Sequence, residues 1–241
     1  TKDSIRKNQL VLDFIVTKGP KVRINNINFG GNLVDETKLK KSLKEIHEKS
    51  RLTLFPVNDK PAIVKTTPYT FEQYLKERGY LTFSKTKKIL NPYVRIGFSS
   101  SKYDIKKYDE SKDNLLNYYN SLGFRDAVIE KDTIYHNAVG HLNIDMQIKE
   151  GRRYFFGNIS WRGNTKYPDS VLSSILNIKK GDIYNREIFF NKLGKTPTAE
   201  GGDISGIYQD DGYLFFSINP IETAVYNDTI DFEVRIQEGP Q

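Results

Sequence analysis

Cysteine is absent from the 241 residues of this sequence. Its absence excludes disulfide frameworks, thiolate metal sites, iron–sulfur clusters and cysteine nucleophiles. Histidine is scarce as well, with only His47, His136 and His141 present, of which the last two flank a short predicted turn. Because no third metal ligand and no paired nucleophile and base accompany them, we expect no catalytic residues, no bound metal and no cofactor. The sequence therefore predicts a protein that is not an enzyme.

Long apolar runs are also missing. The longest, such as Tyr213–Phe216, fall far short of the roughly 20 residues that a membrane-spanning helix needs. Residues 1–20 lack the charged-then-apolar layout of a signal peptide, so we interpret the sequence as a mature fragment of a longer protein. What is present, 37% hydrophobic and 28% charged residues, suffices for small cores in one to two domains.

Three strand-like segments repeat along the chain, and each ends at a glycine. Apolar and polar residues alternate before Gly19, Gly151 and Gly239, which is the period of a strand with one buried face. The apolar positions that coincide when these glycines are aligned are Leu12, Phe14 and Val16; Ile144, Met146 and Ile148; and Phe232, Val234 and Ile236. The chain is therefore expected to consist of repeated structural units.

The two complete units show the same order of predicted elements. A strand that closes on Gly-Asn, at Gly31-Asn32 and at Gly163-Asn164, precedes a helical pattern. A second helix ends in Tyr-x-x-x-Gly followed by an aromatic residue, at 119–124 and 208–213, and a two-stranded hairpin comes next. Each unit therefore reads strand, helix, helix, strand, strand. If its last strand pairs with both others, that strand lies in the middle of the sheet.

This order of elements resembles the POTRA domain. The amino-acid sequence of residues 178–185 and 203–216 is similar to that of BamA-type outer-membrane protein assembly factors, especially their Bacteroidetes-like members. The resemblance covers essentially the whole chain. It implies an α+β fold of tandem POTRA domains, each with a three-stranded mixed sheet packed on two helices. The implied divisions are the last strand or strands of a preceding unit at 1–20, a unit with a large insertion at 21–151, and a unit at 152–241.

The resemblance also implies a function, namely that of a scaffold and receptor on the periplasmic face of a Gram-negative outer membrane. The partners it implies are unfolded outer-membrane proteins, lipoproteins of the assembly machine, the inner leaflet of the outer membrane, and a C-terminal β-barrel of the same polypeptide. Nucleic acid is not among them. POTRA units occur in two-partner secretion transporters too, and that function stays open as an alternative.

A strand at a sheet edge offers unpaired N–H and C=O groups to an extended peptide. We expect the first strand of each hairpin to lie at such an edge. In the second unit this strand, at 214–221, contains Pro220, which has no N–H to donate. The equivalent strand of the first unit has no proline. We therefore predict that a client strand adds there, along Ala127, Val128, Ile129, Glu130, Lys131, Asp132, Thr133, Ile134 and Tyr135.

Positive charge is concentrated in one segment, at 47–107. It contains 13 Lys+Arg and 5 Asp+Glu, a net charge of +8, whereas the rest of the chain carries −1. We interpret it as an insertion with one short helix at about 71–78. Three interpretations of this insertion stay open: a solvated insertion without a binding role, a basic-aromatic module that binds anionic lipid or polymer, and a groove that binds nucleic acid. The absence of a nucleic-acid motif disfavours the third. Its predicted basic surface comprises Lys85, Lys87, Lys88, Arg95, Lys102, Lys106 and Lys107.

Overall fold

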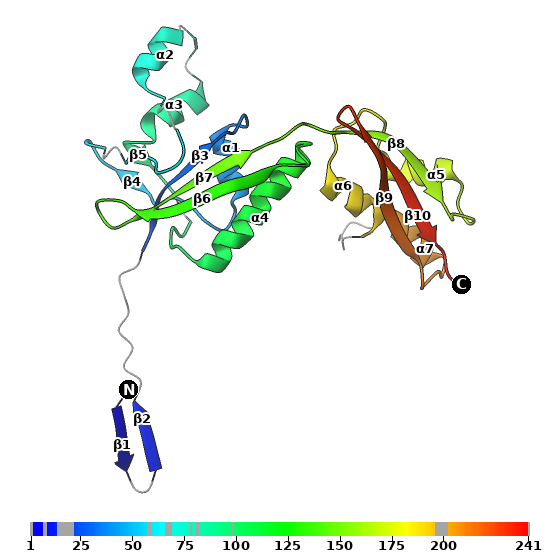
Figure 1. Cartoon of the computed structure of the whole chain (residues 1–241), viewed down its shortest axis with the longest axis horizontal. Coiled ribbons are helices and arrows are strands. Elements are labelled where there is room, and N and C mark those ends of the chain that lie inside the picture. Colours follow the sequence, from blue (N-terminus) through cyan, green and yellow to red (C-terminus); the bar gives the residue numbers. More distant parts are fainter. Residues whose placement is uncertain are drawn as a thin grey trace.

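The computed structural model describes residues 2–6, 9–13, 22–56, 59–65, 69–77, 79–80, 82–97, 99–195 and 202–240. The strands are β1 (Lys2–Arg6), β2 (Gln9–Asp13), β3 (Ile24–Gly30), β4 (Arg51–Leu52), β5 (Val94–Arg95), β6 (Val128–His136), β7 (Leu142–Lys149), β8 (Phe155–Arg162), β9 (Ser217–Tyr226) and β10 (Thr229–Gln237). The helices are α1 (Glu36–Ser42), α2 (Phe71–Glu77), α3 (Phe83–Leu90), α4 (Ile105–Ser121), α5 (Asp169–Leu176), α6 (Arg186–Leu193) and α7 (Ile204–Asp210) (Figure 1).

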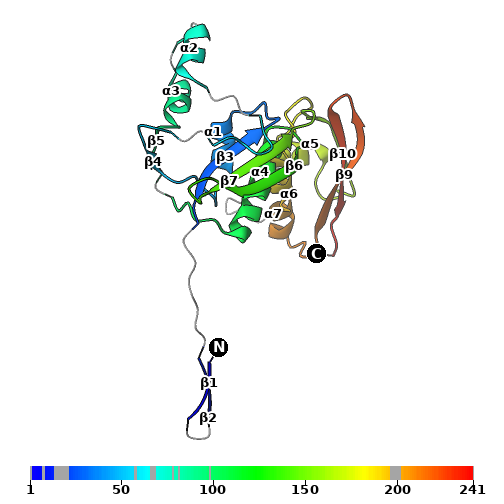
Figure 2. The ribbon, with the colours of Figure 1, turned by 60° about the vertical axis from the view of Figure 1, so that its left-hand side comes forward.

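Two three-stranded mixed sheets carry the fold (Figures 1 and 2). In the first, β7 lies between β3 and β6, parallel to β3 and antiparallel to β6. In the second, β10 lies between β8 and β9 with the same directions. The expected central position of each last strand is therefore confirmed. We call residues 22–151 the first unit and residues 152–240 the second unit.

Alternation in the central strands places one row of side chains in each core. In β10, Ile230, Phe232, Val234 and Ile236 are buried, and none of the residues between them is. In β7, Ile144, Met146 and Ile148 are buried as well, but so are the polar residues Asn143 and Asp145 on the opposite face. The first sheet is therefore covered on both faces, and its second cover was not predicted from the sequence.

The helices complete two separate cores. In the first unit α1 and α4 bury Leu39, Leu115 and Tyr119 against the sheet. In the second unit, α5, α6 and α7 contribute Leu172, Phe189 and Tyr208. Their core partners on β8 and β10 are Phe156, Trp161, Ile230, Phe232, Val234 and Ile236. Two helices were expected in this unit and three are present, because α6 ends at Gly194 with φ +78° and α7 begins anew with Asp203 as its N-cap.

A glutamate before the glycine of each central strand ties the unit together. The Oε1 atom of Glu150 accepts hydrogen bonds from Leu33 N (2.7 Å), Val34 N (3.1 Å) and the Tyr119 hydroxyl (3.0 Å). In the second unit the corresponding bonds to Glu238 come from Thr165 N (2.7 Å), Lys166 N (2.8 Å) and the Tyr208 hydroxyl (3.2 Å). The glutamate and the tyrosine that recur in both units therefore form the same hydrogen-bonded cluster in each.

The glycine of each Gly-Asn pair is required beside the same hydrogen-bonded cluster. Gly31 has φ +74° and Gly163 has φ +88°, in the left-handed region that favours glycine. A Cβ atom at either position would lie 2.2 Å from a carbonyl oxygen of the central strand, that of Ile148 or of Ile236. No side chain fits there, so both glycines fix the path of the chain from the first strand into the first helix.

Near the N-terminus, β1 and β2 pair antiparallel with each other, from Lys2 opposite Asp13 to Arg6 opposite Gln9. The predicted apolar positions Phe14 and Val16, and the glycine at 19, lie outside the described residues. The assignment of 1–20 to a preceding unit therefore stays a prediction. Within the described part of the chain, none of the helices has the length and apolar content needed to cross a lipid bilayer.

The predicted insertion lies between α1 and α4. It contains a small antiparallel pair, β4 with β5, and two helices, α2 and α3, which extend away from the first sheet in both views (Figures 1 and 2). Only one helix was expected. The start of α3 carries a recognisable signal, because the Thr82 hydroxyl accepts from Lys85 N (3.3 Å), and Lys87 and Lys88 occupy the last turn.

Candidate functional site

The first half of the outer edge of β3 is occupied by the insertion. Backbone groups of Ile24, Asn25 and Ile27 are hydrogen-bonded to residues between 48 and 101. These bonds are Ile24 N to Ser101 O (2.8 Å), Lys49 N to Ile24 O (2.8 Å), Ile27 N to Glu48 Oε1 (2.8 Å), and the Arg95 guanidinium to Asn25 O. A peptide could pair with this part of the edge only by displacing the insertion.

A buried ion cluster anchors this contact. Glu48 Oε2 lies 2.8 Å from Arg95 Nη1, and Glu48 Oε1 lies 2.9 Å from Lys40 Nζ. Burial acts to raise the pKa of Glu48, but the charges of Lys40 and Arg95 and the Ile27 amide outweigh it and hold the pKa below its ordinary value. Arg95 was predicted to belong to the basic surface. That prediction is wrong, because its side chain is only 10% exposed and is neutralised by Glu48.

The insertion also covers the face of the first sheet that is turned away from α1 and α4. Asp145 of β7 is fully buried there. Its Oδ2 atom accepts from Ala62 N (2.5 Å) and Ile63 N (3.0 Å), and its Oδ1 atom accepts from Asn28 Nδ2 (2.8 Å). A buried carboxylate is stable only with such donors, so Asp145 fixes the insertion to the sheet.

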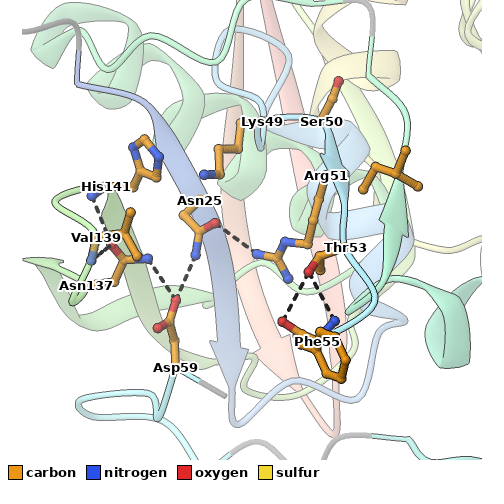
Figure 3. A pocket seen from close by; sticks show the side chains of 11 residues that line it. Asn25, Lys49, Ser50, Arg51, Thr53, Phe55, Asp59, Asn137, Val139 and His141 are labelled. Carbon is orange, nitrogen blue, oxygen red and sulfur yellow. Dashed lines mark hydrogen bonds between the residues drawn. The ribbon is translucent and has the colours of Figure 1, made fainter. Parts of the chain in front are cut away.

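A second carboxylate, Asp59, lies at the border of a polar cavity of about 290 Å³ (Figure 3). Its Oδ2 atom accepts from the side-chain amides of Asn25 (2.7 Å), Asn137 (3.1 Å) and Asn143 (3.2 Å). Arg51 donates to Asn25 Oδ1 from the other side (2.9 Å). These bonds join β3, β7, the β6–β7 turn and the insertion.

The two histidines that flank this turn make contacts within the turn itself. His136 Nδ1 lies 3.3 Å from the Gly140 carbonyl oxygen, and His141 N donates to Asn137 Oδ1 (2.9 Å). Burial, followed by the charges of Lys49 and Arg23, lowers the pKa of His141. Among the residues that the structure describes, no three His, Asp or Glu side chains are placed to hold a metal ion.

Both outer strands of the second sheet are restricted in other ways. At the start of β8, Phe156 N donates to Asp182 O (2.8 Å) and Phe156 O accepts from Gly181 N (2.8 Å). On the other side, β9 carries Pro220 opposite Val234 of β10, and the register shifts after Asp231 of β10. A proline and a bulge both weaken an edge as a template for pairing.

The remaining edge is β6. Within the described residues, the backbone of β6 is hydrogen-bonded only to β7. The register skips Glu130, which forms a bulge, so the regular part of the edge runs from Lys131 to His136. Ala127 was predicted to belong to this edge, but it precedes the strand, is buried, and donates its N–H to Phe124 O. The prediction was therefore wrong at Ala127.

Two side chains hold β6 against the unit. The Tyr108 hydroxyl of α4 donates to Asp132 Oδ2 (2.7 Å), and the Tyr135 hydroxyl donates to Asp145 Oδ1 (3.2 Å). The hydrogen bond from Tyr108, followed by the charge of Lys112, keeps the pKa of Asp132 below its ordinary value even though burial opposes it. The edge is therefore rigidly positioned, which lowers the entropic cost of binding a strand.

The rest of the predicted basic surface lies outside the buried cluster. Lys85, Lys88 and Lys107 form ion pairs with Glu77 (2.8 Å), Asp35 (2.8 Å) and Glu45 (3.4 Å). Lys87, Lys102 and Lys106 are exposed, and among the described residues none of the three has an ion-pair partner. The positive surface is therefore smaller than the sequence count suggests.

The comparisons with known proteins agree with this geometry. A family model described as POTRA, surface antigen variable number repeat, matches residues 22–151 and 154–239. The chain belongs to the POTRA family. The crystal structure of POTRA domains 3–5 of Haemophilus influenzae BamA is similar to the POTRA fold seen here, with a TM-score of 0.52 and 13% identity over 92% of this chain and 70% of that one. The predicted α+β fold of tandem POTRA units is confirmed.

Curated relatives add the protein class that these POTRA units resemble. The outer membrane protein assembly factors BamA of Neorickettsia risticii and Neisseria meningitidis are each 24% identical, over 57% and 58% of this chain. The chain spans less than a fifth of the length of each, 19% and 17%. A deoxyribodipyrimidine photo-lyase of Buchnera aphidicola is 29% identical over 53% of this chain and 29% of its own length, a match that shows neither a family nor an activity.

The two POTRA units meet in a polar junction. Tyr154 N donates to Gly123 O (2.8 Å), and its hydroxyl donates to Asp126 Oδ2 (2.6 Å). Arg125 forms an ion pair with Glu222 of β9 (2.7 Å). The connection between the units is thus supported by contacts from both sides. These contacts hold the β9 edge of one unit beside the end of α4 of the other.

Sequence reasoning missed Glu48, Asp59 and Asp145. Asp145 stands in a strand where alternation predicts a solvent-facing residue, and only the unpredicted path of 59–64 buries it. A signal was nonetheless present. Asn25, Asn28 and Asn143 sit at outward positions of β3 and β7, where their amides can hydrogen-bond to one another and to a carboxylate on a covered sheet face.

Proposed function

We propose that these POTRA units form part of the periplasmic region of an outer-membrane protein assembly or transport system, and that β6 of the first unit binds extended client segments. The family and the two BamA relatives support the system. The observation that carries the binding proposal is the open edge of β6 in a unit whose other edge, β3, is partly covered by its own insertion.

In this proposal a client strand pairs with residues 131–136 and extends the first sheet. Main-chain hydrogen bonds supply affinity without reading sequence, which suits a receptor for many different clients. The exposed side chains of Val128 and Ile134 offer apolar contacts beside the edge, while Glu130 and Lys131 discourage uncontrolled aggregation. Partner lipoproteins of the machine would bind elsewhere on the two units.

The test uses an extended peptide taken from a strand of an outer-membrane protein, added to the isotope-labelled chain. We expect amide chemical shifts to change first at 131–136 and at the neighbouring positions of β7. Successive N–H groups of a strand point to opposite sides. Of the variants Thr133→Pro and Ile134→Pro, one therefore removes a donor of the β6–β7 pairing and the other removes a donor of the open edge.

The variant that keeps the dispersed spectrum of the folded chain is the informative one, and it should lose most of the peptide binding. A scrambled peptide without apolar alternation serves as the control. Shifts that cluster on β9 or β8, or full binding by the folded proline variant, would show that β6 is not the receptor edge.

A further inference from the structure

The outer part of the insertion exposes apolar side chains that no described residue covers. We call residues 69–90, which comprise α2 and α3, the helical tip (Figures 1 and 2). The Tyr80 and Phe83 side chains are 93% and 87% exposed. The other large apolar side chains exposed in the helical tip are Phe71, Leu75 and Leu90. Such a concentration of exposed aromatic and aliphatic groups marks a binding surface.

The two helices are held by polar contacts rather than by a core. None of the described residues of α2 is buried. The Tyr69 hydroxyl donates to Glu77 Oε2 (2.7 Å), and Lys85 Nζ donates to the same oxygen (2.8 Å). Helices of 7 and 8 residues usually need an apolar face packed on a neighbour to be stable. The apolar side chains of the helical tip are therefore available to pack on a surface outside this chain.

Its charges indicate what that surface is. Both acidic residues are already paired, Glu72 with Lys76 (2.9 Å) and Glu77 with Lys85. Lys87 is exposed and lies on the same face of α3 as Phe83 and Leu90, because residues four and seven positions apart share one side of a helix. Apolar groups are thus flanked by uncompensated positive charge, in an insertion with a net charge of +8.

We propose that the helical tip is a peripheral membrane-binding element that inserts Phe71, Leu75, Tyr80 and Phe83 into an anionic phospholipid surface. Aromatic and aliphatic side chains enter the region between headgroups and acyl chains, while lysine stays at the level of the phosphates. A protruding pair of helices with separate apolar groups fits a deformable lipid surface. This proposal is independent of client binding at β6.

The test is flotation of the whole chain with vesicles of phosphatidylcholine alone and of phosphatidylcholine with one-quarter phosphatidylglycerol. We expect binding to the anionic vesicles at low salt, and weaker but measurable binding at 0.5 M NaCl. The double variant Leu75→Ser, Phe83→Ser should bind at least about tenfold more weakly, because two inserted groups are lost. Lys87→Glu should lower binding severalfold at low salt only.

Two matched controls lie in the second unit. Phe215 is 73% exposed, and Phe215→Ser should bind like the unmodified chain. Lys192 is an exposed lysine of α6, and Lys192→Glu should do the same. Thermal unfolding by circular dichroism should be unchanged for the tip variants, since the altered side chains are exposed.

A further readout is the emission of Phe83→Trp, which should shift to shorter wavelength with anionic vesicles. The unmodified chain, whose Trp161 is buried, should not shift. The proposal is overturned by no vesicle binding at low salt, which would favour an acidic protein partner instead. It is overturned equally by binding that the double serine variant retains in full.

Discussion

The two POTRA units place a carboxylate at the same position of the central strand, six residues before the closing glycine, yet they treat it oppositely. In the first unit it is Asp145, fully buried and hydrogen-bonded to the amides of 62 and 63. In the second it is Glu233, partly exposed and paired with Arg235 (2.6 Å). The difference lies in the insertion, which brings backbone donors onto one sheet and not the other.

The same insertion distinguishes the edges of the two sheets. It covers residues 24–27 of the outer edge of β3 with its own backbone, Glu48 and Arg95, whereas among the described residues the backbone hydrogen bonds on the outer edge of β8 are confined to Phe156. A POTRA sheet has two edges at which a peptide could add, and the insertion blocks the first half of one of them in the first unit. The comparison therefore suggests that an insertion can direct peptide addition without contacting the peptide.

The largest expected effect comes from Glu48→Gln. The variant leaves Arg95 buried without its counter-charge, and the loss of one partner of a buried ion pair costs about 3–5 kcal/mol. We expect the free energy of unfolding to fall by this amount in the first unit and to stay unchanged in the second. Hydrogen exchange of the Met146 and Val234 amides measures the two units separately.

Glu233→Gln is the matched control for this variant, because its ion pair with Arg235 is exposed to solvent. Exposed pairs contribute little to stability because solvent screens them, so its effect should be small. Equal losses in both units after Glu48→Gln would show that the insertion supports the whole chain rather than the first sheet.

A smaller loss is expected from Asp145→Ala, which removes the acceptor of two backbone amides. Each buried donor left unsatisfied costs about 1–3 kcal/mol, but water can enter the space that the carboxylate leaves, and the Asn28 and Tyr135 side chains can turn to other partners. We therefore expect the total loss to stay below that of Glu48→Gln. The amides of Ala62 and Ile63 should exchange much faster with solvent, while those of α4 should change little. Protection of Ala62 and Ile63 at the original level would mean that other contacts hold this segment.

Acid should sharpen the comparison further. Burial acts to raise the pKa of Glu48 and of Glu238. The charges of Lys40 and Arg95 outweigh it at Glu48, and hydrogen bonds outweigh it at Glu238, so both pKa values are lowered. A lowered folded-state pKa stabilises the fold above the unfolded value, near 4.5, and this stability disappears as the pH falls through the folded value. Both units should therefore lose stability below about pH 4.5.

In the Glu48→Gln variant the acid-dependent loss should decrease in the first unit and remain in the second, where Glu238 is intact. Denaturant unfolding at several pH values, followed by amide exchange in each unit, checks this. An unchanged acid profile of the first unit would assign its acid sensitivity to other carboxylates, such as Asp132.

The repeated part of the fold was predictable because its signals are local. Alternation before Gly151 and Gly239 predicted the two central strands, and Gly31 and Gly163 sit where a side chain would strike the strand backbone. The insertion was harder to predict, because its contacts join residues far apart in sequence. The bond from Ala62 to Asp145 spans 83 positions. No local pattern reveals such a partner, and the same is true of Arg95, which charge counting placed on the surface.

The smallest expected effect tests why the β9 edge differs from the β6 edge. In Pro220→Thr a backbone N–H is restored, and prolines in sheets are found where that N–H would face solvent. One recovered hydrogen bond is worth about 0.5–1.5 kcal/mol, so we expect peptide affinity at β9 to rise about two- to tenfold. Titration shifts should then appear at 217–222 in addition to 131–136. Binding at β9 should stay weaker than at β6, because Glu222 remains tied to Arg125 and the strand keeps its bulge. If affinity at β9 does not change, the bulge rather than the proline closes that edge.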